Sequence, residues 1–138
     1  MTQLSEIMNP KLITVDTRTS LRQAQRMLDQ HHIRHLLVMD GKRLVGIVTD
    51  RDLRKAAPSS KSPLTASERE EFMDELKVVE VMSRKLITAS STTTVREAAK
   101  AMVREKIGCL PVVDGHTLVG IVTETDLLGI LVRGEETS

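Results

Sequence analysis

The fold of this chain is decided by a stretch of six residues that occurs twice. Leu44-Val45-Gly46-Ile47-Val48-Thr49 returns unchanged, 74 positions later, as Leu118-Val119-Gly120-Ile121-Val122-Thr123. Both copies are rich in β-branched residues and have the composition of a strand. The repetition indicates that the chain contains two copies of one structural unit.

The similarity extends well beyond this stretch. Residues 11–14 recur as residues 85–88 with the same offset, and an alignment of residues 7–53 holds about 20 identities in 47 positions without a gap. We therefore divide the 138 residues into a first repeat, 1–57, a connector, 58–77, and a second repeat, 78–138.

Each repeat has the pattern of a β-α-β-β-α unit. The apolar run 11–15 predicts a strand, and Ser20 with Gln23 has the spacing of a helix capping box. Thr94 and Glu97 hold the same places in the second repeat, and both boxes precede apolar residues at helical spacing. In each repeat, an Asp-Gly turn between two β-rich runs predicts a hairpin, which a short helix follows. In the first repeat the strands are 36–39 and 44–49 and the helix is 50–56; in the second they are 110–113, 118–123 and 124–132.

The two repeats are expected to pack against each other. The predicted strands are nearly all apolar, which suggests burial on both faces. A single unit of about 50 residues would struggle to cover such a sheet alone. We therefore expect an α/β fold of two β-α-β-β-α units packed pseudo-symmetrically through their sheets.

The connector is predicted to contain a helix of its own. It begins with a turn-rich segment, 58–63, and continues with Thr65 at the start of another capping box. We expect the helix to dock on the body through Phe72, Met73 and Leu76, with its charged run facing solvent.

The composition of the chain argues against several kinds of function. Twenty Lys and Arg against nineteen Asp and Glu give a net charge of +1, so a nucleic-acid partner is not expected. With no Trp or Tyr, stacking platforms are excluded, and the lone Cys109 excludes an internal disulfide. Residues 1–10 lack a signal core, and no run approaches the roughly 20 apolar residues of a membrane span. We expect a cytoplasmic protein with no membrane partner.

Two β-α-β-β-α units that each end in Gly-Ile-Val-Thr-x-x-Asp resemble a pair of CBS domains, the regulatory module named after cystathionine β-synthase. The motif stands at residues 46–52 and 120–126, and residues 110–114 are similar to the family's second strand. The resemblance covers nearly the whole chain. Residues 51–54 and the long connector further resemble stand-alone CBS-pair proteins, or Bateman modules, of the acetoin-utilisation type.

The resemblance implies a receptor for adenosine ligands and not an enzyme. CBS pairs commonly bind AMP, ADP, ATP or S-adenosylmethionine in clefts between their two domains, as regulatory ligands and not as required cofactors. They act as energy or metabolite sensors and commonly form homodimers through their helices. A metabolic enzyme regulated in trans is a further partner to be expected.

Carried over position by position, the resemblance also assigns nucleotide-binding residues. Asp52 and Asp126 would accept hydrogen bonds from the ribose hydroxyls, with Thr49 and Thr123 near the ribose and first phosphate. Apart from the resemblance, Arg51 lies three residues from Arg54 and four from Lys55 and could reach a phosphate. The remaining residues would frame the adenine: Ile13, Thr14 and His35 in the first repeat, and Ile87, Thr88, Gly108, Cys109 and Pro111 in the second.

The chemistry of these residues fits such a ligand. A carboxylate only accepts hydrogen bonds and can take both cis hydroxyls of a ribose. The free N–H groups at a helix start attract anions. Without aromatic rings the base must lie between aliphatic walls, for which there are five candidates: Ile13, Ile33, Ile87, Ile107 and Val112.

The two repeats differ at three of the expected positions. Leu37, His35 and Arg51 of the first repeat align with Pro111, Cys109 and Thr125 of the second. The second repeat therefore supplies one cation less, and we expect two unequal clefts.

Plainer interpretations stay open for the aspartates and threonines of this set. Asp52 and Asp126 could complement a helix dipole, and Thr49 and Thr123 could be N-caps. The chain as a whole could be a protein-protein interaction scaffold with vestigial clefts.

Catalytic and metal sites are not expected. His31, His32 and His35 gather between a helix and a strand without Cys or carboxylate residues at ligand spacing, so we favour solvated or phosphate-facing histidines. No phosphate-binding, dinucleotide-binding or nucleophile-elbow motif occurs in the sequence.

Overall fold

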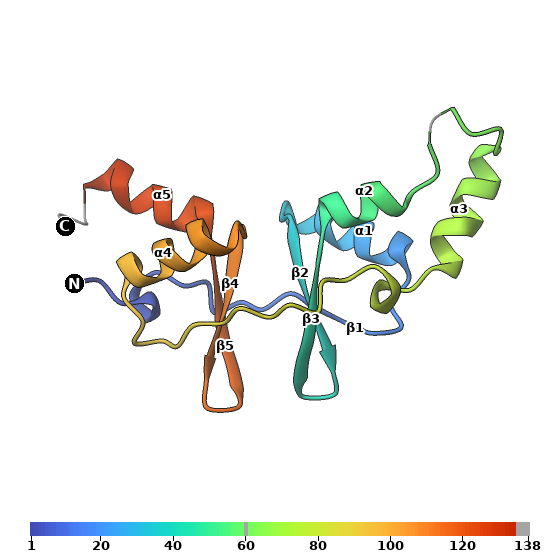
Figure 1. Ribbon diagram of the computed structural model, residues 1–138. Coiled ribbons are helices and arrows are strands. Elements are labelled where there is room, and N and C mark those ends of the chain that lie inside the picture. The colour runs from blue at the N-terminus through green and yellow to red at the C-terminus, as the bar shows by residue number, and fades with distance from the viewer. Residues whose placement is uncertain (60, 135–138) are drawn as a thin grey trace. The chain divides into compact units, whose positions relative to one another are not determined.

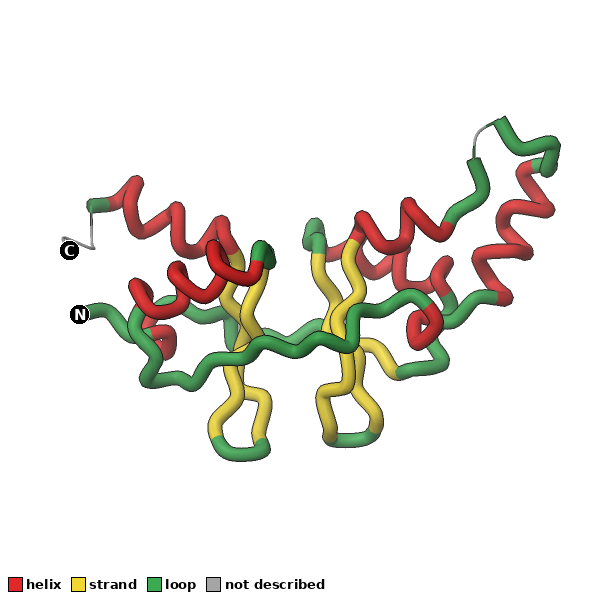
Figure 2. Tube along the Cα trace, in the orientation of Figure 1, coloured by secondary structure: helices red, strands yellow, loops and turns green. Residues whose placement is uncertain are grey.

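Two compact units make up the part of the chain that the structure, a computed structural model, describes: residues 1–59 and 61–134. The first-repeat unit consists of residues 13–86, and the second-repeat unit joins residues 1–12 to the chain from Ile87 onward. Figures 1 and 2 show the hairpin and helices of each unit. Each unit thus contains the body of one repeat and the opening residues of the other.

The first-repeat unit has the predicted β-α-β-β-α order. Its elements are β1 (Thr14–Asp16), α1 (Leu21–His31), β2 (His35–Asp40), β3 (Arg43–Thr49) and α2 (Asp50–Ala56), followed by α3 (Ala66–Glu75) and the 3₁₀ helix η2 (Val78–Glu80). α1 begins at the predicted capping box, where the Gln23 N–H donates to the Ser20 hydroxyl at 3.1 Å. The first strand begins at Thr14 and not at Lys11, because only residues 14–16 pair with β2.

The second-repeat unit has the same order with one exception. Its elements are the 3₁₀ helix η1 (Leu4–Glu6), α4 (Val95–Glu105), β4 (Cys109–Asp114), β5 (Thr117–Thr123) and α5 (Glu124–Arg133). Gly41 and Gly115 turn the two hairpins at φ of +62° and +63°, a conformation that costs glycine little. The exception is the predicted first strand, which is reduced to an isolated bridge between Ala89 and Val112.

A proline explains why this strand stops short. At the bridge, the Ala89 N–H donates to the Pro111 carbonyl at 3.0 Å, and the Val113 N–H donates to the Ala89 carbonyl at 2.7 Å. The next step of a parallel ladder toward Ile87 would use the N–H of residue 111, which proline lacks. In the first repeat Leu37 holds this position, and it pairs with Thr14.

A side chain ends the ladder in the other direction. The Ser91 N–H donates to the Asp114 carboxylate Oδ1 at 2.9 Å, so it is not available to a strand partner. Hydrogen bonding to the Ser91 side chain, and then to its main-chain N–H, lowers the pKa of Asp114 below its ordinary value. The second-repeat sheet is therefore two strands and a bridge, against three strands in the first repeat.

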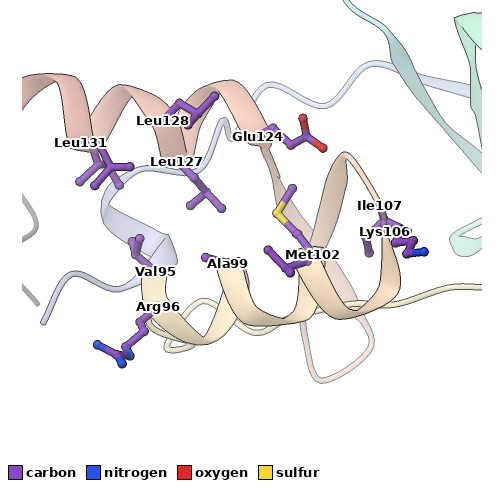
Figure 3. Close-up of a pocket in the computed structure, with 12 residues that line it drawn as sticks. Val95, Arg96, Ala99, Met102, Lys106, Ile107, Glu124, Leu127, Leu128 and Leu131 are labelled. Carbon is purple, nitrogen blue, oxygen red and sulfur yellow. The ribbon is translucent and has the colours of Figure 1, made fainter.

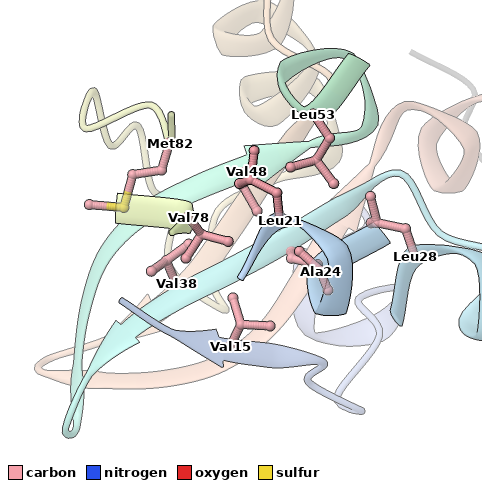
Figure 4. Close-up of a cluster of buried hydrophobic side chains, with 10 residues drawn as sticks. Val15, Leu21, Ala24, Leu28, Val38, Val48, Leu53, Val78 and Met82 are labelled. Atoms are coloured by element: carbon pink, nitrogen blue, oxygen red, sulfur yellow. The ribbon is translucent and has the colours of Figure 1, made fainter. Parts of the chain in front are cut away.

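Each unit has its own hydrophobic core between hairpin and helices. In the first-repeat unit, helix residues Leu21, Ala24 and Leu28 meet strand residues Val38 and Val48 (Figure 4). The equivalent core of the second-repeat unit contains Val95, Ala98, Met102, Val112 and Val122.

The exchanged opening segments complete both cores. Leu4 is fully buried in the second-repeat core, and Val78 is fully buried in the first-repeat core. Met82 lies against Gly46 of β3, where a Cβ atom would collide with its side chain, and Met8 lies against Gly120 in the same way. These contacts fix each segment to the unit that contains it.

The connector helix docks as predicted, with one correction. Asp74 pairs with Arg22 of α1 at 3.0 Å, and Met73 and Leu76 pack against the first-repeat core. Phe72, which we expected on the docked face, is 38% exposed, because the helix turns Met73 inward instead. Among the described residues, no helix is long and apolar enough to cross a membrane.

Candidate functional site

Both repeats carry a matching set of polar groups where the hairpin passes into a helix. In the first-repeat unit, Thr49 ends β3 and its hydroxyl accepts a hydrogen bond from the Asp52 N–H at 3.1 Å. The Asp52 Oδ2 atom accepts one from the Thr49 N–H at 2.9 Å. The pair is a capping box that fixes the start of α2.

The second-repeat junction repeats this geometry and adds one hydrogen bond. The Thr123 N–H donates to Asp126 Oδ2 at 2.8 Å, and the Asp126 N–H donates to the Thr123 hydroxyl at 3.4 Å. The Thr123 hydroxyl also donates to Oδ2 at 3.1 Å. The capping role that a plainer interpretation gave these threonines is therefore confirmed.

The capping hydrogen bonds use only one carboxylate oxygen of each aspartate. Every hydrogen bond that Asp52 and Asp126 accept from the described residues goes to Oδ2, so Oδ1 accepts none. Both residues are half-buried and reach solvent. A carboxylate has about four acceptor positions, so capping leaves capacity for a ligand. The sequence held a signal for the cap, because Thr-x-x-Asp has the capping-box spacing.

The helix starts offer fewer free donors than we expected from sequence. The Asp50 N–H donates to the Arg34 carbonyl at 3.0 Å, and the Asp52 N–H donates to the capping hydroxyl of Thr49. Of these first three N–H groups of α2, only that of Arg51 is left without a partner among the described residues. In the second-repeat unit, the Gly108 carbonyl accepts the corresponding bond at 3.1 Å, and Thr125 keeps the remaining N–H. Each junction therefore presents one orphan donor beside one free carboxylate oxygen.

The two junctions differ in the charge around them. In the first repeat, Arg51 is exposed and Arg54 pairs with Asp50 at 3.4 Å, so two cations stand beside the carboxylates. Thr125 and Leu128 occupy the positions of these arginines in the second repeat. The second junction is the more negative of the two.

Hairpin pairing brings further predicted residues to the junctions. His35 lies opposite Thr49, and Cys109 lies opposite Thr123. Thr14 is exposed on β1, beside β2. The hairpins thus bring together residues that lie far apart in the sequence.

Cys109 is buried, as is Pro111 of the predicted set. Its side chain is 3% exposed, and burial raises the pKa of its thiol to about 12. The thiol is therefore protonated at neutral pH and is no nucleophile. A ligand at this position would meet the main chain of β4.

One of the five residues predicted to form aliphatic walls is on the wrong face. Val112 is fully buried in the second-repeat core, so it cannot line a ligand site, because alternation along β4 turns it toward the helices. The other four candidates are partly buried against the cores of their units: Ile13, Ile33, Ile87 and Ile107. Thr88 is exposed next to Ile87, in the segment that Pro111 keeps from pairing.

Of the three grouped histidines, two lie at the end of α1 and His35 begins β2. His31 is the last residue of α1, and His32 caps this helix in the left-handed conformation at φ 53°, both exposed to solvent. Across residues 1–59 and 61–134, no group of three or more His, Cys, Asp or Glu side chains could hold a metal ion.

Comparison with known proteins gives the site its context. Residues 4–59 and 78–133 each match the family model of the CBS domain. A CBS domain-containing protein of Dictyostelium discoideum is 36% identical over 132 residues, which cover 94% of this chain and 91% of that protein.

Two solved structures have the same fold over almost the full length of the chain. The CBS domain pair of protein MJ0100, in complex with 5′-methylthioadenosine and S-adenosyl-L-methionine, superposes with a TM-score of 0.78 at 31% identity and 99% coverage of both chains. A Vibrio cholerae protein assigned to acetoin utilization (AcuB) superposes with a TM-score of 0.79 at 28% identity, covering 100% of this chain and 99% of that one.

Proposed function

This chain belongs to the CBS domain family, and on that premise we propose that it is a non-catalytic regulatory module that binds an adenosine-containing ligand at the Thr-Asp junctions of its repeats. The free Oδ1 of Asp126, held in place by the capping box beside an orphan N–H, is the observation that carries the proposal. The carboxylate accepts the ribose hydroxyls, and its position costs nothing to organise because the cap already fixes it.

The site is completed by main-chain and aliphatic groups. Thr88 and the main chain around Cys109 and Pro111 frame the base in the second repeat, and Ile87 and Ile107 supply apolar contact. In the first repeat, Ile13, Thr14 and His35 take the same roles. The relative with bound 5′-methylthioadenosine and S-adenosyl-L-methionine supports a ligand of this class.

The charge around the junctions points to two ligand preferences. Arg51 and Arg54 offset the carboxylates of the first repeat, which suits a phosphorylated ligand such as AMP, ADP or ATP. The second repeat has Thr125 and Leu128 in their place, which favours an uncharged or cationic adenosine derivative such as S-adenosylmethionine.

As an energy or metabolite sensor, the protein acts through a partner. A ligand changes a protein only by binding one arrangement more tightly than another. We propose that the protein works as a cytoplasmic homodimer and that ligand binding alters its affinity for a metabolic enzyme in trans.

The proposal is tested by isothermal calorimetry of nucleotide-stripped protein against AMP, ADP, ATP, S-adenosylmethionine and 5′-methylthioadenosine. We expect micromolar binding of at least one ligand, with a stoichiometry that counts the working sites. Since the chain has no Trp or Tyr, the protein hardly absorbs in the near ultraviolet, and a co-purified nucleotide would dominate the absorbance spectrum. No binding across the panel would overturn the proposal and favour an interaction scaffold.

A further inference from the structure

A small hollow lies in the second-repeat unit, between α4 and the segment that leads into this helix. Its volume is about 330 Å³. Thr88, Ala89 and Thr93 line it from the segment, Leu110 lines it from β4, and residues of α4 complete it. Of these residues, only Thr88 also belongs to the set expected to bind an adenosine ligand. The volume is at the lower end for a ligand pocket, which suits a ligand smaller than a nucleotide.

The hollow lies on the face of α4 that is turned away from α5. On the opposite face, an apolar groove opens between the two helices (Figure 3), with Val103 and Leu128 exposed. The first repeat has Asp29 and Arg54 at these two positions, so its matching face is polar. The hollow shares no lining residue with the groove. It is therefore a separate feature of the second-repeat unit.

Comparison with the first repeat explains why the hollow exists. Val15 and Met27 hold the positions of Ala89 and Ala101, which both line it. Val15 is buried in the first-repeat core, and Met27 packs against that core. Replacing two large side chains by alanines leaves space where the longer chains would lie. The hollow therefore has room for an aliphatic side chain like the one that Met27 supplies in the first repeat.

Three charged side chains of α4 line the hollow, and each has polar atoms to spare. Lys100 has no side-chain partner among the described residues. Arg104 pairs with Glu105 through Nε at 3.2 Å, so its two terminal nitrogens have no partner in the described part of the chain. Glu97 accepts the Thr94 hydroxyl at Oε1 at 2.9 Å, and no described group donates to its Oε2. Two cations and one anion are thus available to a ligand.

The first repeat lacks this combination of charges. Gln23 and Gln30 stand in place of Glu97 and Arg104. The Gln23 side chain accepts the Ser20 N–H at 3.2 Å and closes the capping box of α1, whereas Glu97 closes no such box. The charges of the second repeat are therefore not needed to form the helix, because the same fold forms with glutamine at both positions.

We propose that the hollow binds a free aliphatic α-amino acid, such as methionine or leucine. The carboxylate of the ligand pairs with Lys100 and Arg104, its ammonium group pairs with Glu97, and its side chain lies against Ala101. Charges of both signs select a zwitterion, because Glu97 repels a phosphate and the two cations repel an amine. The aliphatic side chain restores the apolar contact that Met27 makes in the first repeat. This site goes beyond the proposed function and does not depend on it.

An NMR titration of the full chain, labelled with nitrogen-15, tests the proposal. We expect L-leucine and L-methionine to shift the amide signals of Ala89 and Ala101 in a saturable way, with millimolar or tighter affinity. Two analogues of leucine each lack one charge: 4-methylpentanoate has no ammonium group, and 3-methylbutylamine has no carboxylate. Each should bind at least about tenfold more weakly than leucine, because it leaves one charged group of the site unpaired.

The duplication supplies the variants, since each introduces the residue that the first repeat has at the same position. Ala101→Met fills the hollow and should abolish binding of leucine. Glu97→Gln should weaken leucine by about tenfold without weakening 4-methylpentanoate, whereas Arg104→Gln should weaken both. Arg96→Gln removes a cation from the opposite face of α4 and is the control that should leave affinity unchanged. The spectrum itself reports whether each variant is folded.

Several results would overturn the proposal. The absence of saturable shifts with both amino acids would mean that the hollow is not an amino-acid site, as would a response to inorganic phosphate alone. Equal affinity for leucine and 4-methylpentanoate would remove Glu97 from the site. Unchanged leucine binding in folded Ala101→Met would place the ligand elsewhere on the protein. None of these results depends on adenosine binding, which the calorimetry above judges separately.

Discussion

In the first repeat, β1 pairs with β2 over three residues, whereas in the second repeat the matching segment makes one bridge through Ala89. The helix junctions next to these edges share a capping box, with one further hydrogen bond at Asp126, and the second junction is the more negative of the two. The helical faces differ again, polar in the first repeat and apolar in the second. Cores, turns and caps are shared by the two repeats, whereas the strand edge, the charges at the junction and the helical face differ.

This comparison shows that few substitutions suffice to give two copies of one fold different edges and surfaces. Pro111 shortens a strand, Thr125 removes a cation, and Leu128 turns a surface apolar. Each change leaves the cores as they are. The experiments below test whether these differences matter, from the largest expected effect to the smallest.

The largest difference is expected in thiol reactivity at matched strand positions. Because burial raises the Cys109 pKa from 9.0 to about 12, its thiolate population near neutral pH falls by about a thousandfold. His35→Cys in a Cys109→Ala background places a thiol at the half-buried position of the first repeat. We expect that thiol to react with a disulfide reagent far faster than Cys109, which should react readily only after unfolding.

The same pKa shift gives stability a pH dependence. A thiol whose folded pKa is raised contributes stability that is complete below the unfolded pKa of 9.0 and is lost as pH rises toward about 12. Cys109→Ala should flatten this alkaline loss in urea unfolding curves. Rapid labelling of Cys109 in folded protein would contradict the burial on which both expectations depend.

Loss of the junction carboxylates should have the next largest effect, on ligand affinity. Asp52→Ala and Asp126→Ala should each weaken binding at one site by about tenfold to a hundredfold, since a charge-assisted hydrogen bond contributes about 1.5–3 kcal/mol. Calorimetry should show that each variant removes a different binding event. Both variants also lose the carboxylate half of the capping box, whereas the hydroxyls of Thr49 and Thr123 can still cap the helices.

The asparagine variants separate the two roles. Asp52→Asn and Asp126→Asn keep an acceptor oxygen for the cap but lose the charge. Weak binding by a fully stable Asn variant would assign the carboxylate to the ligand. Unchanged affinity in Asp126→Ala would remove that residue from the site.

Local patterns predicted most of this fold because caps and tight turns depend on neighbours in sequence. Ser20, Thr65 and Thr94 begin helices where their spacing predicted, and Gly41 and Gly115 turn the hairpins as expected. The capped junctions lie where the repeated motif placed them, and their use as a ligand site stays a prediction.

Local sequence patterns did not predict the features that depend on contacts between residues distant in the sequence. Leu4 of the first repeat is buried in the core of the second, and Val78 of the second repeat is buried in the core of the first. No local sequence pattern indicates this exchange, although the two residues are equivalent in the duplication. Val112 and Phe72 were placed on the wrong faces, because helical and strand periodicity fix a face only relative to neighbours and not to the rest of the fold.

The exchanged segments offer a comparison in which the two units should behave alike. Gly46→Ala places a methyl group against Met82, and Gly120→Ala does the same against Met8. Each should lower the free energy of unfolding by about 1–3 kcal/mol, the usual cost of overpacking. Urea denaturation measures the loss, and Met82→Ala or Met8→Ala should restore part of it in the matching variant.

Gly129→Ala is the control for the loss of a glycine itself. Its new methyl group meets only the flexible end of Arg133, so helix propensity should raise stability by up to about 1 kcal/mol. If Gly46→Ala were as harmless as Gly129→Ala, the segment around Met82 would not be held as the contacts indicate.

The smallest effect, and the sharpest test of the charge difference, comes from exchanging the residues of the two junctions. Arg51→Thr should weaken the binding of ATP relative to that of adenosine at the first repeat, and Thr125→Arg should strengthen the binding of ATP at the second. Each affinity should change by only about twofold to fivefold, because exposed charges are screened. Calorimetry at low and high salt measures both, and the effect should shrink as salt rises. The fold should not respond, since both side chains are exposed. Equal changes for ATP and adenosine would mean that these positions act on the helix start and not on a phosphate, and the two repeats would then differ in charge without differing in ligand.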